Sequence, residues 1–403
     1  MPVRAARKIK WTLFGAQAFG SAGFLVASTV TPIVGAQLSG RPSFAGVPTA
    51  GYWAGAALAT LLWGRLMDPI GRRRTLVAGL LVGVTGALIA AHFVVEGSFV
   101  GFVAGLALMG AANAALQLAR FMAGEVHPLE HRGRAISTVV LGGTVGAVLG
   151  PALVAPMSRL AVAVGDPPLA GPYAASAGFF AAGALLIASL LWPDPRDLAR
   201  EIHRAATPDT RGRRVLEILK DPAVPLAVLT MAIAQVVMVM LMVITSLHMS
   251  HHHHALSSIA AVMSSHVFGM YAFSLASGRI ADAWGRGPLI GIGAVVLFIS
   301  CLTATLSTDV TPLAVSLFLL GLGWNFCYVG CSTLLSDCLT QAERARFQSI
   351  NDFVLTTLAG SGSALSGVVF SRLGYAIMGY VGAALSAALL LLSLKAGSRP
   401  AEA

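Results

Sequence analysis

The sequence predicts an all-α membrane protein whose twelve transmembrane helices form two six-helix repeats. Of its 403 residues, 56% are hydrophobic and 11% are charged, whereas a soluble domain carries roughly 25% charged residues. Each apolar run is long enough to cross a hydrocarbon core of ~30 Å once. The runs lie near residues 11–36, 46–67, 75–97, 99–123, 135–160, 168–192, 223–248, 257–280, 287–308, 311–336, 347–371 and 373–395.

The basic residues predict the orientation. If both termini are cytoplasmic, the inner side receives all 27 Lys and Arg except Arg41, Arg159 and Arg372, as the positive-inside rule requires. The first apolar run is too long for a signal-peptide core. The net charge of +10 does not indicate a nucleic-acid partner, because the basic residues are scattered and not interleaved with aromatic ones. The lipid bilayer is the expected partner.

An internal repeat and a polar segment predict the domain organisation. Glu125, Arg132 and Arg134 recur as Asp337, Arg344 and Arg346, 212 positions later, and Asn113 recurs as Asn325. Two parallel six-helix repeats are a known transporter plan. We therefore expect an N-terminal six-helix bundle over 1–192, a cytoplasmic linker over 193–222, and a C-terminal six-helix bundle over 223–403.

The loop after the second run reads GRLMDPIGRRR from Gly64, and a second copy, GRIADAWGR, begins at Gly278. This pattern resembles the loop signature of the major facilitator family. The resemblance implies a major facilitator fold and charge clusters that latch the cytoplasmic face. The alternative is simple positive-inside flanking charge. The residues assigned to the cytoplasmic gate are Gly64, Asp68, Gly71, Arg72, Arg73, Glu125, Arg132, Gly278, Asp282, Gly285, Arg286, Asp337 and Arg344.

Two further features bear on whether transport is coupled to a second ion such as a proton. The segment from Gly146 to Pro151 is similar to the glycine–proline motif of the family's antiporters, although it also fits a small-residue packing face. None of the acidic residues is placed near a helix midpoint. A proton-coupled drug pump normally needs such a carboxylate within the membrane. The absence of one makes a proton-coupled drug pump a less favoured interpretation, without excluding it.

Methionine and histidine concentrate between residues 231 and 270. Met238 and Met242 are four apart on the seventh helix, and His266 and Met270 are four apart on the eighth, so each pair shares one helix face. At ~1.5 Å per residue from the outer turn, the two pairs overlap in depth. Thioether and imidazole ligands suit Cu(I). The alternatives are methionine as a flexible core filler and a histidine satisfied by a neighbouring hydroxyl or carbonyl.

This Met-x-x-x-Met and His-x-x-x-Met pattern resembles that of the CcoA-type copper importers. The resemblance places Met238, Met242, His266 and Met270 on that family's proposed copper ligands. It implies import of copper across the bacterial inner membrane by alternating access, in support of cytochrome oxidase assembly, with a cytoplasmic copper acceptor. Some relatives are riboflavin transporters, so an organic solute such as a riboflavin-like compound or a drug remains the alternative.

Two more clusters are candidates for handling metal. An outer turn contains His248, Met249, His251, His252, His253 and His254, which we expect to collect metal ions at the mouth of the site, unless it is a solvated polar turn. Cys327, Cys331 and Cys338 on the tenth helix are candidates for a relay towards the cytoplasm, unless they are small buried hydrophobes.

The remaining function classes are less favoured. A membrane receptor that binds metal without moving it would need no transport cycle, but no signalling domain is visible. The sequence shows no catalytic triad, phosphate loop or water-activating metal cluster, so an enzyme is not expected. No cofactor is expected either, and copper enters only as the transported ion.

Overall fold

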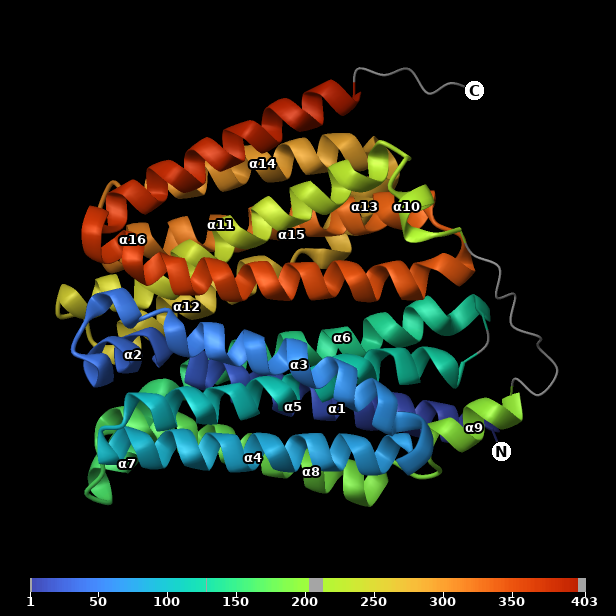
Figure 1. Cartoon of the computed structure of the whole chain (residues 1–403), viewed down its shortest axis with the longest axis horizontal. Coiled ribbons are helices and arrows are strands. Elements are labelled where there is room, and N and C mark those ends of the chain that lie inside the picture. Colours follow the sequence, from blue (N-terminus) through green and yellow to red (C-terminus); the bar gives the residue numbers. More distant parts are fainter. Residues whose placement is uncertain (1, 128, 203–212, 398–403) are drawn as a thin grey trace. The chain divides into compact units, whose positions relative to one another are not determined.

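The computed structural model describes residues 2–127, 129–202 and 213–397, and within this part the chain is helical with no strand (Figure 1). In the first part of the chain the helices are α1 (Pro2–Ser28), α2 (Thr31–Ser39), α3 (Val47–Ile70), α4 (Arg72–Glu96), α5 (Phe99–Glu125), α6 (Leu129–Ala152), α7 (Val154–Ala163), α8 (Gly171–Leu190) and α9 (Pro195–Ile202). The second part contains α10 (Val215–Ile218), α11 (Ala223–His251), α12 (Leu256–Tyr271), α13 (Ser274–Trp284), α14 (Arg286–Thr303), α15 (Val310–Cys338) and α16 (Gln341–Gly397). Two short 3-10 helices lie at Pro42–Phe44 and Pro168–Ala170.

The helices account for all twelve predicted crossings. Ten segments of the described chain are long and apolar enough to span a membrane. One of these, Phe347–Ser393, contains Gly374, whose non-helical backbone divides α16 into two helices. The 24-residue helix α3 supplies the remaining crossing. The protein is therefore a multi-pass membrane protein of the predicted all-α class.

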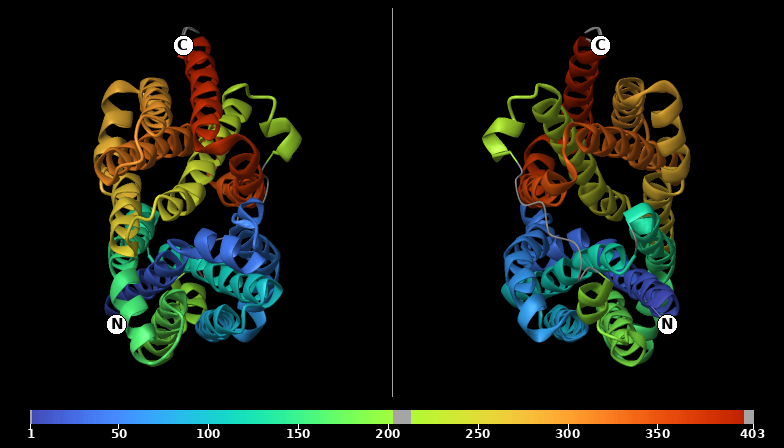
Figure 2. Two further views of the ribbon diagram at one scale, coloured as in Figure 1. Left: turned by 90° about the vertical axis from the view of Figure 1, so that its left-hand side faces the viewer. Right: turned by 90° about the vertical axis from the view of Figure 1, so that its right-hand side faces the viewer.

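The chain separates into two units, Met1–Thr207 and Pro208–Ala403. Within each unit the long helices run side by side, and Figure 2 views them nearly end-on. The predicted role of 193–222 as a cytoplasmic linker between two bundles stays a prediction, and residues 203–212 of it lie outside the described chain.

Helix packing repeats between the two units. In the first unit α1 packs on α6, α3 on α5, and α4 on both α5 and α8. In the second unit α11 packs on α16, α12 on α15, and α14 on both α15 and α16. The same pairing in both units is the structural form of the sequence repeat.

Glycine and proline set the helix boundaries. Pro48 and Pro172 occupy the first turns of α3 and α8, where a missing N–H costs nothing. Gly71 and Gly285 connect α3 to α4 and α13 to α14, with φ of +97° and +95°. Only glycine adopts this conformation readily, so the signature requires glycine at both positions for the turn itself.

Some predicted crossings are interrupted. The first run is divided between α1 and α2, and the run 135–160 is divided between α6 and α7 after Pro151. Proline has no N–H to continue the helical pattern, and α6 ends one residue later. The run 257–280 is divided at Ala272–Phe273, between α12 and α13. Hydropathy alone does not reveal these breaks, because each short helix remains apolar.

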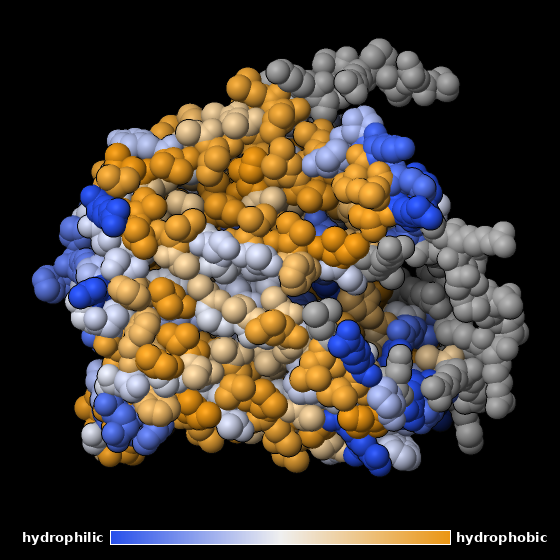
Figure 3. All heavy atoms as spheres, in the orientation of Figure 1, coloured by the Kyte–Doolittle hydropathy of each residue, from blue (hydrophilic) through white to orange (hydrophobic). Residues whose placement is uncertain are grey.

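Small residues bring helices into close contact within the first unit. A Cβ at Gly150 would lie 2.9 Å from the carbonyl oxygen of Ala22, and one at Gly146 would lie 2.7 Å from the nitrogen of the same residue, on α1. The segment from Gly146 to Pro151 therefore acts as a packing face, as one of the two sequence interpretations predicts. Figure 3 shows hydrophobic residues over the middle of the helices and hydrophilic residues gathered towards helix ends.

Candidate functional site

The candidate site lies wholly within the second unit, where α15 packs against both α11 and α12. These are the helices that carry the predicted ligands. The contacts of α15 with these two helices therefore determine the position of each predicted ligand along the α15 axis.

His266 is fully buried and is held by α15. Its Nδ1 lies 2.9 Å from the carbonyl oxygen of Leu317. Because a carbonyl can only accept a hydrogen bond, Nδ1 carries the proton and donates. The other ring nitrogen, Nε2, is buried and has no hydrogen-bond partner among the described residues. A buried nitrogen without a partner is uncommon in folded proteins and calls for a physical reason.

Two glycines allow α12 to approach α15 at backbone distance. A Cβ at Gly321 would meet the carbonyl oxygen of His266 and would lie 2.8 Å from the backbone nitrogen of Met270. A Cβ at Gly269 would meet the carbonyl of Phe318. Ser265 adds a hydrogen bond of 2.9 Å to the carbonyl of Ala314. His266 and Met270 are therefore held at the levels of Leu317 and Gly321.

A side-chain hydrogen bond fixes the register of α11. Trp324 Nε1 donates to Gln235 Oε1 at 2.9 Å. Successive crossings alternate in direction, so α11 and α15, the first and fourth crossings of the unit, are antiparallel. Moving outward from this bond at ~1.5 Å per residue places Met238 near the level of Gly321 and Met242 near that of Leu317. Gln235, Met238 and Met242 share one helix face.

The structure thus brings the four predicted ligands to two shared levels beside α15. Met242 and His266 lie at the level of Leu317, whereas Met238 and Met270 lie at the level of Gly321. Met238 and Met270 are buried, and Met242 is half-buried. Met240, by contrast, faces Gly362 of α16. Counted along the helices in this way, the levels of the two pairs overlap, while the predicted site and the coordination of one ion by all four side chains stay predictions.

The outer histidines are spread over separate contacts. The His248 ring stacks on Tyr375 at 4.1 Å and lies 4.7 Å from the His252 ring. His254 Nε2 lies 2.8 Å from the carbonyl of Thr308. Within the described chain, no three His, Cys, Asp or Glu side chains form a group that could hold a metal ion. Collection of metal at this turn, including at Met249, His251 and His253, stays a prediction.

The cysteines of α15 face different neighbours. Cys327 Sγ lies 3.8 Å from the carbonyl of Ile290 and against Gly293, both on α14. Cys331 is buried in a hydrophobic cluster that includes Met231 of α11 and Ile290 of α14. Cys338 is the last residue of α15. Cys327 is therefore turned away from the face of α15 that holds His266, and a relay through all three thiols stays a prediction.

Comparison with known proteins identifies the family. The family model described as Major Facilitator Superfamily matches residues 13–251 and 227–403. The chain belongs to the major facilitator superfamily. It is 32% identical to the uncharacterised MFS-type transporter YdeG of Bacillus subtilis, over 99% of this chain and 94% of that protein. It is 30% identical to the riboflavin transporter RfnT of Brucella anthropi, over 99% of both chains.

Solved structures share the fold at low sequence identity. The nucleoside transporter NupG superimposes with a TM-score of 0.71 at 14% identity, covering 98% of this chain and 99% of NupG. A bacterial homologue of the lysosomal transporter Spinster gives a TM-score of 0.68 at 14% identity, covering 98% of this chain and 99% of that one. This major facilitator protein therefore has the fold of membrane transporters.

The major facilitator signature forms charge contacts in both units. Arg72 pairs with Glu125 in the first unit. In the second, Arg286 Nε lies 2.9 Å from Asp337 Oδ2 and Nη1 lies 3.8 Å from Asp282 Oδ1. The side chains of Asp68, Arg132 and Arg344 lie outside the described part of the chain. The remaining contacts match the predicted clusters, while their role as a gate stays a prediction.

The outer glycines of the signature have a different environment from the turn glycines. A Cβ at Gly64 or Gly278 would meet no described atom within 4 Å. Close helix approach is therefore not seen at these two positions. Arg73, the remaining member of the set, donates from Nη2 to the carbonyl of Ala188.

Asp194 is a structural anchor that the sequence analysis does not include. Its carboxylate accepts the backbone N–H groups of Arg72 at 3.3 Å and Arg73 at 3.1 Å, at the first turn of α4. A Cβ at Gly71 would lie 2.9 Å from Asp194 Oδ2, so this glycine gives the carboxylate room. The signal in the sequence is an acidic residue between Pro193 and Pro195 at an inner helix end.

Arg213 and Glu343 form a second anchor that the sequence analysis missed. The buried Glu343 carboxylate accepts hydrogen bonds from Arg213 Nε and Nη2, both at 2.9 Å, and from the backbone N–H of Thr340 at 3.0 Å. Hydrogen bonding to Arg213 holds the pKa of Glu343 well below its usual range. This pair ties the chain before α11 to the start of α16.

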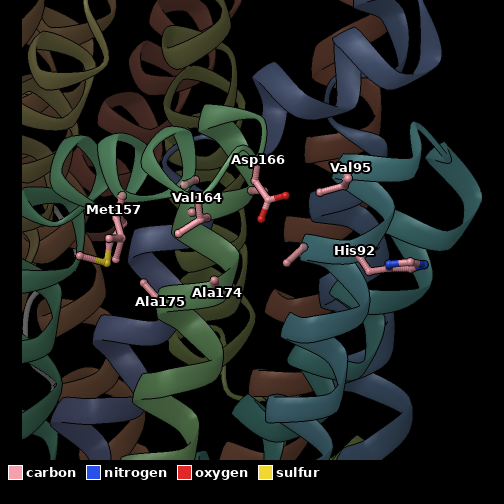
Figure 4. A pocket seen from close by; sticks show the side chains of 12 residues that line it. His92, Val95, Met157, Val164, Asp166, Ala174 and Ala175 are labelled. Carbon is pink, nitrogen blue, oxygen red and sulfur yellow. The ribbon is translucent and has the colours of Figure 1, made fainter.

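A cavity of about 580 Å³ lies elsewhere, in the first unit between α4, α7 and α8. Figure 4 shows the Asp166 carboxylate between Val164 and Val95, while the His92 ring points away from them. None of the predicted metal ligands lines this cavity, so it is separate from the candidate site.

Proposed function

We propose that this major facilitator protein imports copper as Cu(I) across the bacterial inner membrane. The observation that supports this most strongly is the buried Nε2 of His266, which has no hydrogen-bond partner in the part of the chain that the structure describes. The contact of Nδ1 with Leu317 leaves the Nε2 lone pair available as a metal ligand. Metal-binding histidines commonly use their second nitrogen in this way, because a carbonyl partner fixes the tautomer and the ring orientation.

The neighbouring side chains suit the same ion. Thioether sulfur is a soft donor that selects Cu(I) over hard divalent cations, which prefer carboxylate oxygen. Met238, Met242, His266 and Met270 are all neutral donors, so the site would hold a single positive charge. An apolar setting tolerates one charge better when several donors replace its hydration shell.

The transport cycle follows from the fold. Copper binds to α11 and α12, and the two units alternate between outward and inward access. The contacts of Arg72 with Glu125 and of Arg286 with Asp337 stabilise one of these states. We expect both termini in the cytoplasm, because the basic residues follow the positive-inside pattern. A cytoplasmic acceptor then removes the ion, which supplies cytochrome oxidase assembly.

The test is uptake of radioactive copper into cells that lack their own importer. Wild type is compared with Met238→Ala, His266→Ala and Met270→Ala. The matched control is Met240→Ala, because this methionine is also buried on α11 but faces α16. The amount of each variant in the membrane is measured by immunoblotting.

We expect copper uptake by wild type and Met240→Ala, with at least a tenfold loss in the three ligand variants. Equal uptake by the ligand variants and the control would contradict a site on α11 and α12. Absence of wild-type uptake, with the protein in the membrane, would contradict copper import itself.

A riboflavin-like solute is the second candidate. The similarity to RfnT over 99% of both chains favours it. Trp324 and Tyr328, both half-buried, also stack at 4.8 Å and offer an aromatic surface to a flat ring. Growth of a riboflavin auxotroph on low riboflavin separates the two: growth that depends on Trp324 but not on His266 would favour the organic solute.

A further inference from the structure

A break in the second crossing of the C-terminal unit lies next to a predicted ligand. Helix α12 ends at Tyr271, the chain turns through Ala272 and Phe273, and α13 begins at Ser274. Interrupted helices recur at the binding sites of membrane transporters, where the released backbone groups need other partners. Here the carbonyl of Met270 lies in the last turn before the break.

Asn325 on α15 supplies the partner for this carbonyl. Its side chain is 3% exposed, and Nδ2 donates to the carbonyl oxygen of Met270 at 2.6 Å and to Ser274 Oγ at 2.9 Å. Ser277 Oγ in turn donates to Asn325 Oδ1 at 2.5 Å. One amide therefore joins the end of α12, the start of α13 and the middle of α15.

The sequence repeat shows that this arrangement is specific to the second unit. Asn113 stands 212 positions before Asn325. The loop signatures, however, are 214 positions apart, so Ala56 and Thr60 correspond to Met270 and Ser274. Helix α3 is continuous there, and Thr60 Oγ1 donates to the carbonyl of Ala56 within the same helix. The first unit thus has the asparagine without the break and without the methionine.

We propose that Asn325 is a positioning residue for the metal site, which holds the broken end of α12 so that the Met270 thioether stays at the level of Gly321, one helical turn from His266. This inference rests on the proposed copper function. A buried amide is suited to the role, because it satisfies a carbonyl without adding charge beside a cationic ion. Loss of such outer contacts typically costs about 10–100-fold in metal affinity.

The experiment counts the ligands directly. Purified protein is loaded with Cu(I), and X-ray absorption at the copper edge measures the sulfur and nitrogen neighbours in wild type, Asn325→Ala and Asn325→Leu. The leucine variant keeps a branched, somewhat larger side chain at this position and leaves no cavity, so it carries the same test if the alanine variant does not fold. Asn113→Ala is the matched control at the repeat position. The KM and maximal rate of copper uptake are measured in parallel.

We expect wild type and Asn113→Ala to show three sulfur neighbours and one nitrogen. The Asn325 variants should lose one sulfur and raise KM by about 10–100-fold, with little change in maximal rate, as expected when only binding is weakened. An unchanged sulfur count and KM in a folded Asn325 variant would overturn the inference and leave copper import intact. Failure of wild type to bind copper would instead reject the copper function, and this inference with it.

Discussion

Gly321→Ala tests whether backbone contact between α12 and α15 positions the ligands. The added Cβ would lie 2.8 Å from the backbone nitrogen of Met270 and would also meet the carbonyl of His266, whereas ordinary contact begins at 3.4 Å. The two backbones must therefore separate by roughly 0.6 Å or more at Met270, which exceeds the ~0.2 Å tolerance of metal–ligand distances. A side-chain rotation cannot relieve this contact, because both partners are backbone atoms.

The expected effects on stability and transport differ in size. Overpacking costs about 1–3 kcal/mol, while the better helix propensity of alanine returns up to about 1 kcal/mol. The net cost to the free energy of unfolding is therefore about 0–3 kcal/mol, which is less than the total stability of a typical folded protein. Copper affinity should fall by about 10–100-fold, because two ligands move together.

The assay pairs thermal unfolding in detergent with the KM of copper uptake. Gly178→Ala on α8 is the matched control, since its Cβ would meet nothing within 4 Å. We expect the control to be as stable as wild type or slightly more so, with an unchanged KM. A Gly321→Ala protein with wild-type KM would refute the argument that this contact sets the ligand geometry.

Three further predictions concern the inner ends of the helices. The pKa of Glu343 is lower in the folded state, so its contact with Arg213 stabilises the protein fully above the unfolded pKa of about 4.3, and this stability is lost as pH falls towards the folded pKa. Glu343→Gln should therefore flatten the fall of Tm between about pH 5 and pH 3, and an unchanged slope would contradict this. Gly285→Ala should lower the free energy of unfolding by about 1–3 kcal/mol, because alanine is strained at the positive φ of this position. Gly287→Ala is the control, since its Cβ would meet no described atom within 4 Å. Equal melting temperatures of the two variants would exclude backbone strain at Gly285. Asp194→Ala should lower the free energy of unfolding by about 0.5–2 kcal/mol, because it removes the hydrogen-bond acceptor at the start of α4. Unfolding in detergent measures this change. A stability equal to wild type would contradict a stabilising role for the carboxylate.

Sequence patterns predicted the crossings well, because hydrophobic length is set by the bilayer and not by packing. All twelve runs lie on helices. The break at Ala272–Phe273 escaped detection because the flanking residues remain apolar and no proline marks it. It is stabilised by Asn325, which is more than 50 positions away in the chain, and such a contact depends on how α15 packs.

At the candidate site, too, sequence patterns predicted some features, while others depend on how the helices pack. Helical spacing placed Met238 and Met242 on one face, and counting from the outer turn predicted an overlap in depth with His266, which stays a prediction. Spacing could not show that Leu317 binds Nδ1 and leaves Nε2 without a partner. Nor could it show that Cys327 turns towards α14, because the rotation of α15 about its axis depends on its neighbours.

The hydrogen bond from His266 to Leu317 has a consequence for the electrical character of transport. The ring proton resides on Nδ1, where the carbonyl holds it, so an ion that arrives at Nε2 need not expel a proton. With neutral methionines as the other donors, each transported ion would carry one net positive charge inward. An inward-negative membrane potential then drives accumulation at ~2.3 kcal/mol per 100 mV, and the cycle would register as an inward current.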